Sequence, residues 1–181
     1  LFLSIISLWA DEGFREYEKL DDGIRINSEK SQLRLNFLYD DVIEVIYAAS
    51  GHPYTDESLI VTNEKRYRVN WDILESDELI TLETDKIKAE IDKSSGRISF
   101  LNKNGDIILQ ETPAKARELR PEKVLGYDTF NARQSFLCSE DEAIYGFGQH
   151  QDGLMNYRGN SVLLVQDNTV AIVPFMVSSK G

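Results

Sequence analysis

The feature that most constrains the fold is a strict alternation of apolar and polar residues, interrupted by two tight turns. Ile87–Ile91 alternates and leads into the turn Lys93–Gly96. Ile98–Leu101 follows, and Asn102–Gly105, which ends in Asn-Gly, leads into Ile107–Leu109. Alternation with a period of two is typical of a half-buried strand, and Asn-Gly is the strongest short hairpin signal. The stretch therefore predicts a meander of three antiparallel strands.

The same alternation predicts strands at residues 32–37, 42–48 and 79–84, and further strands are expected at 132–137, 143–147, 161–166 and 170–177. Only Asp72–Ser76 suggests a turn of helix. Glu111–Asn131 contains two of the four prolines and is expected to be a surface excursion. About ten short strands at regular spacing are typical of a sandwich. The predicted fold class is mainly β: an antiparallel β-sandwich with little helix.

The net charge of the chain limits which binding partners are expected. The 181 residues include 31 acidic and 20 basic side chains, which gives a formal net charge of −11. Such a surface repels phosphate backbones and anionic lipid headgroups, so neither nucleic acid nor a membrane surface is an expected partner. Neutral ligands such as sugars are compatible with this charge, although the charge does not itself point to them.

Few residues suit metal binding or catalysis. Cys138 is the single cysteine, so no disulfide forms within the chain, and we expect this residue to be small, apolar and buried. His52 and His150 are too few for most transition-metal sites, and no metal and no cofactor is predicted. The carboxylates cluster in runs of like charge beside turn residues, where solvation explains them. No catalytic residue is predicted.

The first ten residues, Leu1–Ala10, form an apolar run that is too short to span a bilayer. The run is typical of the core of a signal peptide that ends in a small residue, and the alternative is a first β-strand or a buried N-terminal segment. If it is a signal core, the protein is exported, to a bacterial periplasm or beyond. Residues 11–181 then form the sandwich domain.

The most distinctive stretch combines glycines with polar and aromatic side chains. Its glycines at 146, 148, 153 and 159 permit sharp turns and close backbone approach. Sugar hydroxyls need planar polar groups, and the C–H face of a sugar ring needs an aromatic neighbour. The stretch offers both, although a polar, glycine-rich connection between strands has the same composition.

The same region resembles family 31 glycoside hydrolases, the group of α-glucosidases and α-xylosidases. The resemblance rests on several motifs in a fixed order, within about residues 85–181: the Ile87–Gln110 meander, Arg133–Phe136, Asp141–Ala143, Tyr145–Gln149, Asn156–Gly159, Gln166, Asn168-Thr169 and Pro174–Ser179. It is looser over residues 20–84. Motifs that recur in the same order are far more specific than any one glycine pattern.

This resemblance implies a galactose-mutarotase-like N-terminal sandwich that precedes a catalytic (β/α)₈ barrel. In the family the barrel supplies two aspartates that act by the retaining two-carboxylate mechanism. Neither barrel motif occurs in this sequence, so the chain is expected to stop before the barrel and to be inactive alone. Its expected partners are an α-linked gluco- or xylo-oligosaccharide and its own barrel.

The resemblance also places a loop of the sandwich, within Asn156–Thr169 here, at the rim of the substrate pocket. The expected rim residues, with the three nearest the substrate first, are Gln166, Asp167, Asn168, His150, Asp152, Tyr157 and Arg158. The alternative is a free-standing carbohydrate-binding β-sandwich. A third possibility is a mutarotase-like enzyme, which would need a histidine and a carboxylate that converge on one concave face.

Overall fold

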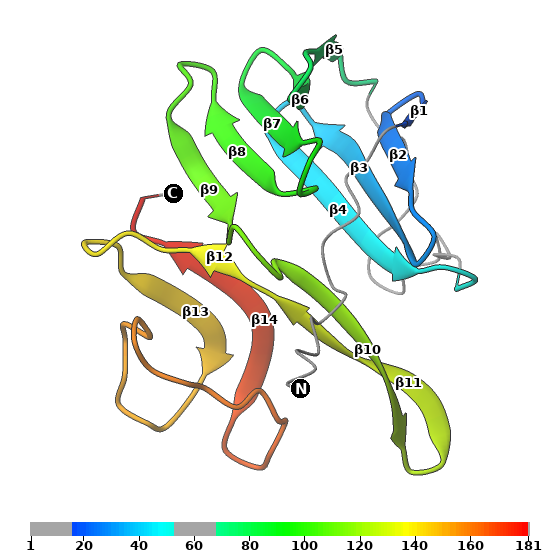
Figure 1. Cartoon of the computed structure of the whole chain (residues 1–181). Helices are drawn as coiled ribbons and strands as arrows, with labels where there is room; N and C mark the ends of the chain where they lie inside the picture. The colour runs from blue at the N-terminus through cyan, green and yellow to red at the C-terminus, as the bar shows by residue number, and fades with distance from the viewer. Residues whose placement is uncertain (1–15, 53–67, 181) are drawn as a thin grey trace, which may run out of the picture. The chain divides into compact units, whose positions relative to one another are not determined.

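The computed structural model describes residues 16–52 and 68–180, and the predicted signal segment lies outside these residues. Every regular element within the described residues is a β-strand, and all strand pairs are antiparallel (Figure 1). The described residues therefore include no helix that could cross a membrane. The chain divides into two compact units, Leu1–Leu137 and Cys138–Gly181.

Within the described residues the first unit contains three sheets, which are the two-stranded hairpin described below and two larger sheets. One has four strands in sequence order: β1 (Glu18–Lys19), β2 (Gly23–Asn27), β3 (Ser31–Tyr39) and β4 (Val42–Ala49). The other has six strands in the order β12-β9-β8-β7-β6-β5, which span Phe136–Leu137, Ile107–Glu111, Ile98–Asn102, Ile87–Asp92, Leu79–Glu83 and Asp72–Glu75. The predicted meander is β7-β8-β9, at the centre of the second sheet.

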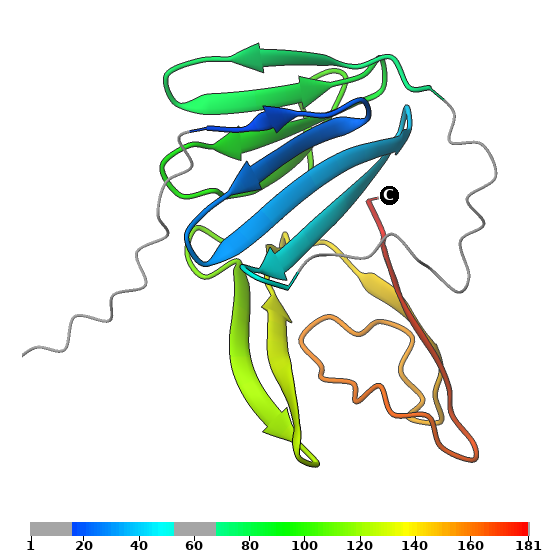
Figure 2. The same ribbon diagram turned by 90° about the vertical axis from the view of Figure 1, so that its right-hand side faces the viewer.

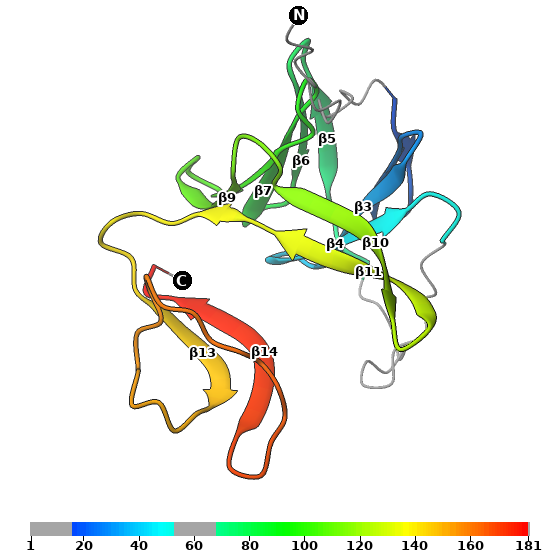
Figure 3. The same ribbon diagram turned by 60° about the horizontal axis from the view of Figure 1, so that its bottom comes forward.

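The two sheets lie face to face, as Figures 2 and 3 show. Alternate residues of each sheet point inward and form one core: Ile24, Ile26, Leu33, Leu35 and Phe37 from the first, and Ile80, Leu82, Ala89, Ile91 and Ile98 from the second. Two sheets that share one apolar layer are a β-sandwich. The predicted fold class is confirmed.

Gly23 shows how closely the strands of the first sheet approach. A Cβ atom at this position would lie 1.8 Å from the carbonyl oxygen of Leu35 on β3. Any other residue would push the two strands apart, so the register that places Ile24 opposite Leu35 depends on glycine here.

The region predicted to be a surface excursion, Glu111–Asn131, lies mostly at the surface, and it is mostly ordered strand. β10 (Arg117–Val124) pairs along its whole length with β11 (Tyr127–Gln134). Leu125 and Gly126 connect the strands at positive φ angles of 50° and 88°. The hairpin extends beyond the sandwich (Figure 1), and most of its side chains are exposed. It therefore lacks the alternation of a half-buried strand.

Two predictions about secondary structure are wrong. Asp72–Ser76 forms no helical turn, because Asp72–Glu75 pairs with β6 as strand β5. The hydroxyl of Ser76 fixes the turn between them by accepting a hydrogen bond from the Leu79 amide at 3.0 Å. Residues 161–166 form no strand in the second unit. β2 was not predicted, since it offers only two inward apolar side chains.

A buried carboxylate, Glu111 at the end of β9, joins the hairpin to the sandwich. It is 2% exposed and accepts hydrogen bonds from the Ile98 amide at 2.8 Å, the Gln134 side chain at 2.7 Å and Arg117 Nη1 at 2.9 Å. Arg117 also donates to the carbonyl oxygen of Gly96 and lies 5.4 Å above the Tyr47 ring. Strands β4, β8, β9, β10 and β11 thus meet at one ion pair.

We predict that Glu111→Ala destabilises the first unit by about 3 kcal/mol or more, because the substitution leaves the Arg117 charge buried and unpaired. Urea denaturation followed by the fluorescence of Trp71, which packs on Phe37, measures this change. The matched control is Asp128→Ala. Its ion pair with Lys123 is exposed on both sides and contributes less than about 1 kcal/mol. Equal losses in the two variants would contradict the assignment.

Candidate functional site

The second unit is a two-stranded antiparallel sheet of β13 (Ile144–Gln149) and β14 (Ala171–Ser178) within the described residues. The connection between these strands, residues 150–170, contains all seven predicted rim residues. The structure places them in three groups: a cluster beside β13, a polar network at the end of the sheet, and a turn that precedes β14.

A β-bulge in β13 shapes the first group. Gly146, Phe147 and Gly148 have consecutive positive φ angles of 108°, 66° and 99°, and the register with β14 shifts between the two glycines. A Cβ atom at Gly148 would lie 2.1 Å from the Ala171 carbonyl oxygen, and one at Gly146 would lie 2.4 Å from that of Phe175. Only glycine fits at either position. A bulge re-aims the side chain within it.

The re-aimed side chain is that of Phe147, which packs edge-on against Tyr157 with ring centroids 5.4 Å apart. Tyr157 is 7% exposed, and its hydroxyl donates to Asp152 Oδ2 at 3.3 Å. Burial first, and the Asp152 charge second, raise the pKa of the Tyr157 phenol. His150 lies 6.1 Å from the same ring, and its Nε2 lies 2.9 Å from the Phe147 carbonyl oxygen. Of the predicted residues, Tyr157 thus belongs to the aromatic pair, and His150 and Asp152 both contact Tyr157.

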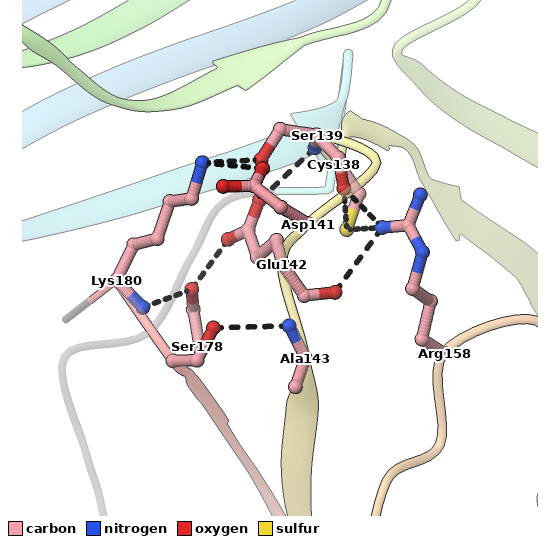
Figure 4. A network of polar contacts seen from close by, with 9 residues as sticks. Cys138, Ser139, Asp141, Glu142, Ala143, Arg158, Ser178 and Lys180 are labelled. Atoms are coloured by element: carbon pink, nitrogen blue, oxygen red, sulfur yellow. Dashed lines mark hydrogen bonds and ion pairs between the residues drawn. The ribbon is translucent and has the colours of Figure 1, made fainter.

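Arg158 belongs to the second group, the polar network at the end of the sheet (Figure 4). Its Nη1 donates to the carbonyl oxygens of Ser139 and Glu142, the latter at 3.2 Å, and lies 2.9 Å from Cys138 Sγ. The guanidinium therefore clamps the chain that enters β13. In the second unit as described, these contacts commit Arg158 to the backbone.

Glu142 is the centre of the same network. Its carboxylate accepts hydrogen bonds from the Ser139 amide at 3.1 Å and from the Ser178 hydroxyl, which joins the start of β13 to the end of β14. The hydrogen bond from Ser178 lowers the pKa of Glu142, and bonds from Ser139 act in the same direction. Lys180 donates to Asp141 at 2.8 Å and to the Ser139 hydroxyl at 2.7 Å. A lowered pKa is the opposite of what an acid catalyst needs.

The third group is the turn Asp167–Val170 with Gln166 before it. The Gln166 side-chain amide makes hydrogen bonds to the backbone at the start of β14 that a neighbouring strand would otherwise make. Its Nε2 donates to the Val170 carbonyl at 2.6 Å, and its Oε1 accepts from the Ile172 amide at 3.2 Å. Asp167 Oδ1 accepts from the Asn168 amide at 2.7 Å. Gln166, Asp167 and Asn168 are all exposed. The turn therefore presents its polar side chains to solvent.

A hollow of about 450 Å³ opens between the first two groups. It is lined by Cys138, Ile144, Phe147, Tyr157, Arg158, Gly159, Asn160 and Val162. Cys138 is exposed, so the expectation of a buried cysteine is wrong. Its position at the start of a turn, beside a guanidinium, keeps the thiol at the surface. Among the described residues, no three His, Cys, Asp or Glu side chains form a group that could hold a metal ion.

Sequence reasoning did not select Phe147, Glu142 or Ser178. Phe147 lies between two glycines, and that pairing was the available signal for a bulge. Glu142 and Ser178 are 36 residues apart, and nothing local in the sequence predicts their contact.

We predict that Gly148→Ala disrupts the second unit, because the added methyl group meets the β14 backbone at a φ angle that L-residues avoid. Gly153→Ala is the matched control: its φ is also positive, at 74°, but a Cβ atom there meets nothing within 4 Å. The control should cost only about 1–2 kcal/mol. Limited proteolysis compares the variants, and equal cleavage rates would contradict the bulge.

A second prediction concerns acid. The folded pKa of Glu142 lies below its unfolded value, so the network stabilises the second unit above about pH 4.3, the ordinary value for glutamate. This contribution is lost as the pH falls through the folded pKa. Ser178→Ala, which removes the first cause of the shift, should flatten the dependence of proteolytic resistance on pH between about 5 and 3. An unchanged profile would show that the network does not contribute.

Comparison with known proteins identifies the domain. Residues 32–181 match the model of the glycosyl hydrolase 31 N-terminal galactose mutarotase-like domain. The α-xylosidase of Saccharolobus solfataricus is 30% identical over 159 residues, which are 82% of this chain and 21% of that protein. α-Xylosidase A of Aspergillus niger is 28% identical over 171 residues, which are 88% of this chain and 22% of that protein. The chain thus spans about a fifth of the length of these curated relatives.

Solved structures agree with the sequence matches. The crystal structure of the family 31 α-xylosidase from Xanthomonas citri superposes with a TM-score of 0.81 at 33% identity, over 90% of this chain and 18% of that one. A dextranase of the same family from Flavobacterium johnsoniae shares the fold, with a TM-score of 0.76 at 15% identity. Fold, ordered motifs and family model agree, and the chain belongs to the N-terminal mutarotase-like domains of family 31 glycosyl hydrolases.

Proposed function

We propose that the full-length protein hydrolyses α-linked xylosides or glucosides at the non-reducing end, with retention of configuration. The observation that carries this proposal is the family match over residues 32–181, together with relatives that are named α-xylosidases. In the retaining mechanism two carboxyl groups lie about 5 Å apart, one as nucleophile and one as acid and base. The proposed source of both is a catalytic barrel outside this sequence.

We propose that this domain is inactive alone. Among the described carboxylates of the second unit, Glu142 and Asp141 have lowered pKa values, and both hold backbone or lysine partners. Asp152 accepts from Tyr157, and Asp167 accepts from a neighbouring amide. Each of these carboxylates has a local structural partner, which supports a role in scaffolding rather than in bond cleavage.

The surface of the second unit supports packing against further polypeptide. Both strands expose large apolar side chains: Tyr145, Val173, Phe175, Met176 and Val177. A two-stranded sheet is marginally stable in water, and it gains stability when its apolar residues are covered. The proposed cover is the remainder of the full-length enzyme, with its barrel.

The turn that contains Gln166, Asp167 and Asn168 is the proposed rim of the substrate pocket. Two features support this proposal. The three side chains are exposed. The Gln166 amide fixes the turn against β14, and neither Asp167 Oδ2 nor the Asn168 side-chain amide takes part in those bonds. A fixed turn with exposed acceptors and donors suits sugar hydroxyls, because ordering it costs little on binding.

Export is a further proposal. It rests on the composition of Leu1–Ala10, an apolar run that ends in a small residue before the acidic Asp11-Glu12. Cell fractionation of the source organism with an antibody to the domain tests it. Recovery of the protein only in the cytoplasmic fraction would refute export.

The rim assignment predicts the behaviour of Asp167→Ala in the full-length enzyme. We expect kcat/KM on xylo- and gluco-oligosaccharides to fall about tenfold, the effect of losing one charge-assisted hydrogen bond. The thermal stability should be unchanged, since the carboxylate is exposed. Asp128→Ala, at the exposed hairpin, is the control and should leave kcat/KM unchanged. Equal kinetics of the two variants would remove Asp167 from the rim.

A further inference from the structure

A second hollow lies in the first unit, on the sandwich and apart from the motifs that carry the family likeness. Its volume is about 720 Å³, and it is lined by Leu20, Asp21, Asp22, Arg25, Arg34, Arg68 and Val69. An adjoining hollow of about 400 Å³ shares four of these residues and adds Lys19, Asn70, Trp71 and Asp72. The two hollows adjoin at these shared residues, and we refer to them together as the arginine groove.

Three guanidinium groups line the larger part of the arginine groove. Arg25 on β2 stands directly opposite Arg34 on β3 in the antiparallel ladder. Like charges at directly opposed positions repel, so this pairing needs an anion nearby. Glu18 contacts Arg25 Nη1 at 2.9 Å, and Asp22 lies 3.6 Å from Arg34 Nη2. Arg68, the third, is exposed and has no ion-pair partner among the described residues.

One donor in this arrangement has no partner. Arg25 Nε is buried, and it is the only buried side-chain nitrogen or oxygen in the described part of the chain that lacks a hydrogen bond. Buried polar groups are nearly always satisfied, and an exception calls for a missing ligand or ordered water. A guanidinium group is planar and presents its N–H groups as a fork that matches the two oxygens of a carboxylate, and Nη1 of Arg25 already contacts the Glu18 carboxylate.

The rest of the lining narrows the class of anion. Asp21 and Asp22 leave an excess of only one positive charge among the lining residues of the larger hollow, and Glu18 pairs with Arg25, so Arg68 is the cation of this hollow that has no ion-pair partner in the described part of the chain. A singly charged carboxylate suits that balance, whereas a doubly charged phosphate would be repelled by both aspartates. The adjoining part adds the Asn70 amide, the Asp72 carboxylate and the indole of Trp71, whose Nε1 donates to the Asp21 carbonyl at 3.1 Å. Such groups suit the hydroxyls beside a carboxylate.

We propose that the arginine groove binds a carboxylate-bearing sugar, a uronate, with its carboxylate held by Arg25 and Arg68 and its hydroxyls directed toward Asn70 and Asp72. The residues of this site belong to the first unit, and those of the proposed substrate rim belong to the second. Uronate binding stands whether or not the proposed glycosidase activity is correct.

Calorimetric titration of the whole chain with trigalacturonate tests this proposal, with xylotriose as the neutral probe and acetate as the simple carboxylate. We expect trigalacturonate to bind and xylotriose not to bind. Arg68→Ala should weaken binding about tenfold or more through one lost charge-assisted contact. Arg25→Lys keeps a charge for Glu18 but removes the fork, and it should also weaken binding severalfold.

Lys103→Ala is the matched control, because Lys103 is exposed on the turn between β8 and β9 and does not line the groove. It should leave the affinity unchanged. Arg68 lies outside the strands, so its variant should keep the circular dichroism spectrum of the parent chain. Acetate that binds as tightly as trigalacturonate, with the same dependence on Arg68, would support the carboxylate site and remove the sugar from it. Absence of trigalacturonate binding, or equal affinity of all variants, would overturn the proposal.

Discussion

The structure of the first unit depends on one buried carboxylate. Glu111 sits where β9 ends, and its two oxygens accept from three strands, while its partner Arg117 reaches the Gly96 carbonyl and the Tyr47 ring. The apolar core fixes how the two sheets face each other, but it extends only through the inner faces of the sandwich. The long β10–β11 hairpin contributes little to that core, so its attachment is polar. A charge in this position is costly unless every oxygen is satisfied, and here each is.

Polar contacts also hold the second unit together. Its sheet has two strands in the described residues, and a glycine-bounded bulge turns Phe147 onto Tyr157. The Glu142 network then ties the start of β13 to the end of β14 (Figure 4). Between these two fixed ends, Gln166 holds the turn with side-chain bonds that a strand would otherwise supply. The loop is therefore ordered by polar contacts, while much of the apolar surface of the sheet is left exposed.

The sequence predicts those parts of the fold in which one face of a strand is buried. The β7-β8-β9 meander follows from its alternation and its turns, and all of these strands contribute to the sandwich sheet. The β10–β11 hairpin could not be predicted in this way, because its two faces are mostly exposed and its residues carry no alternation. Residues 161–166 contain an apolar run at 162–165, yet no strand forms there, and the Gln166 side chain bonds the Val170 carbonyl and the Ile172 amide that a neighbouring strand would otherwise bond. The seven candidate site residues were placed in one connection by sequence motifs, but their division into three groups depends on the bulge and on long-range contacts.

The central claim is that this domain provides scaffold and pocket rim, and that bond cleavage needs the rest of the enzyme. The most direct measurement is release of p-nitrophenol from p-nitrophenyl α-xyloside and α-glucoside by residues 11–181, side by side with the full-length protein at equal molar concentration. The account predicts turnover by the full-length protein and none by the domain, even though the domain is folded by circular dichroism. Turnover by the domain alone would contradict the account, since it would require a catalytic pair of carboxylates within these residues.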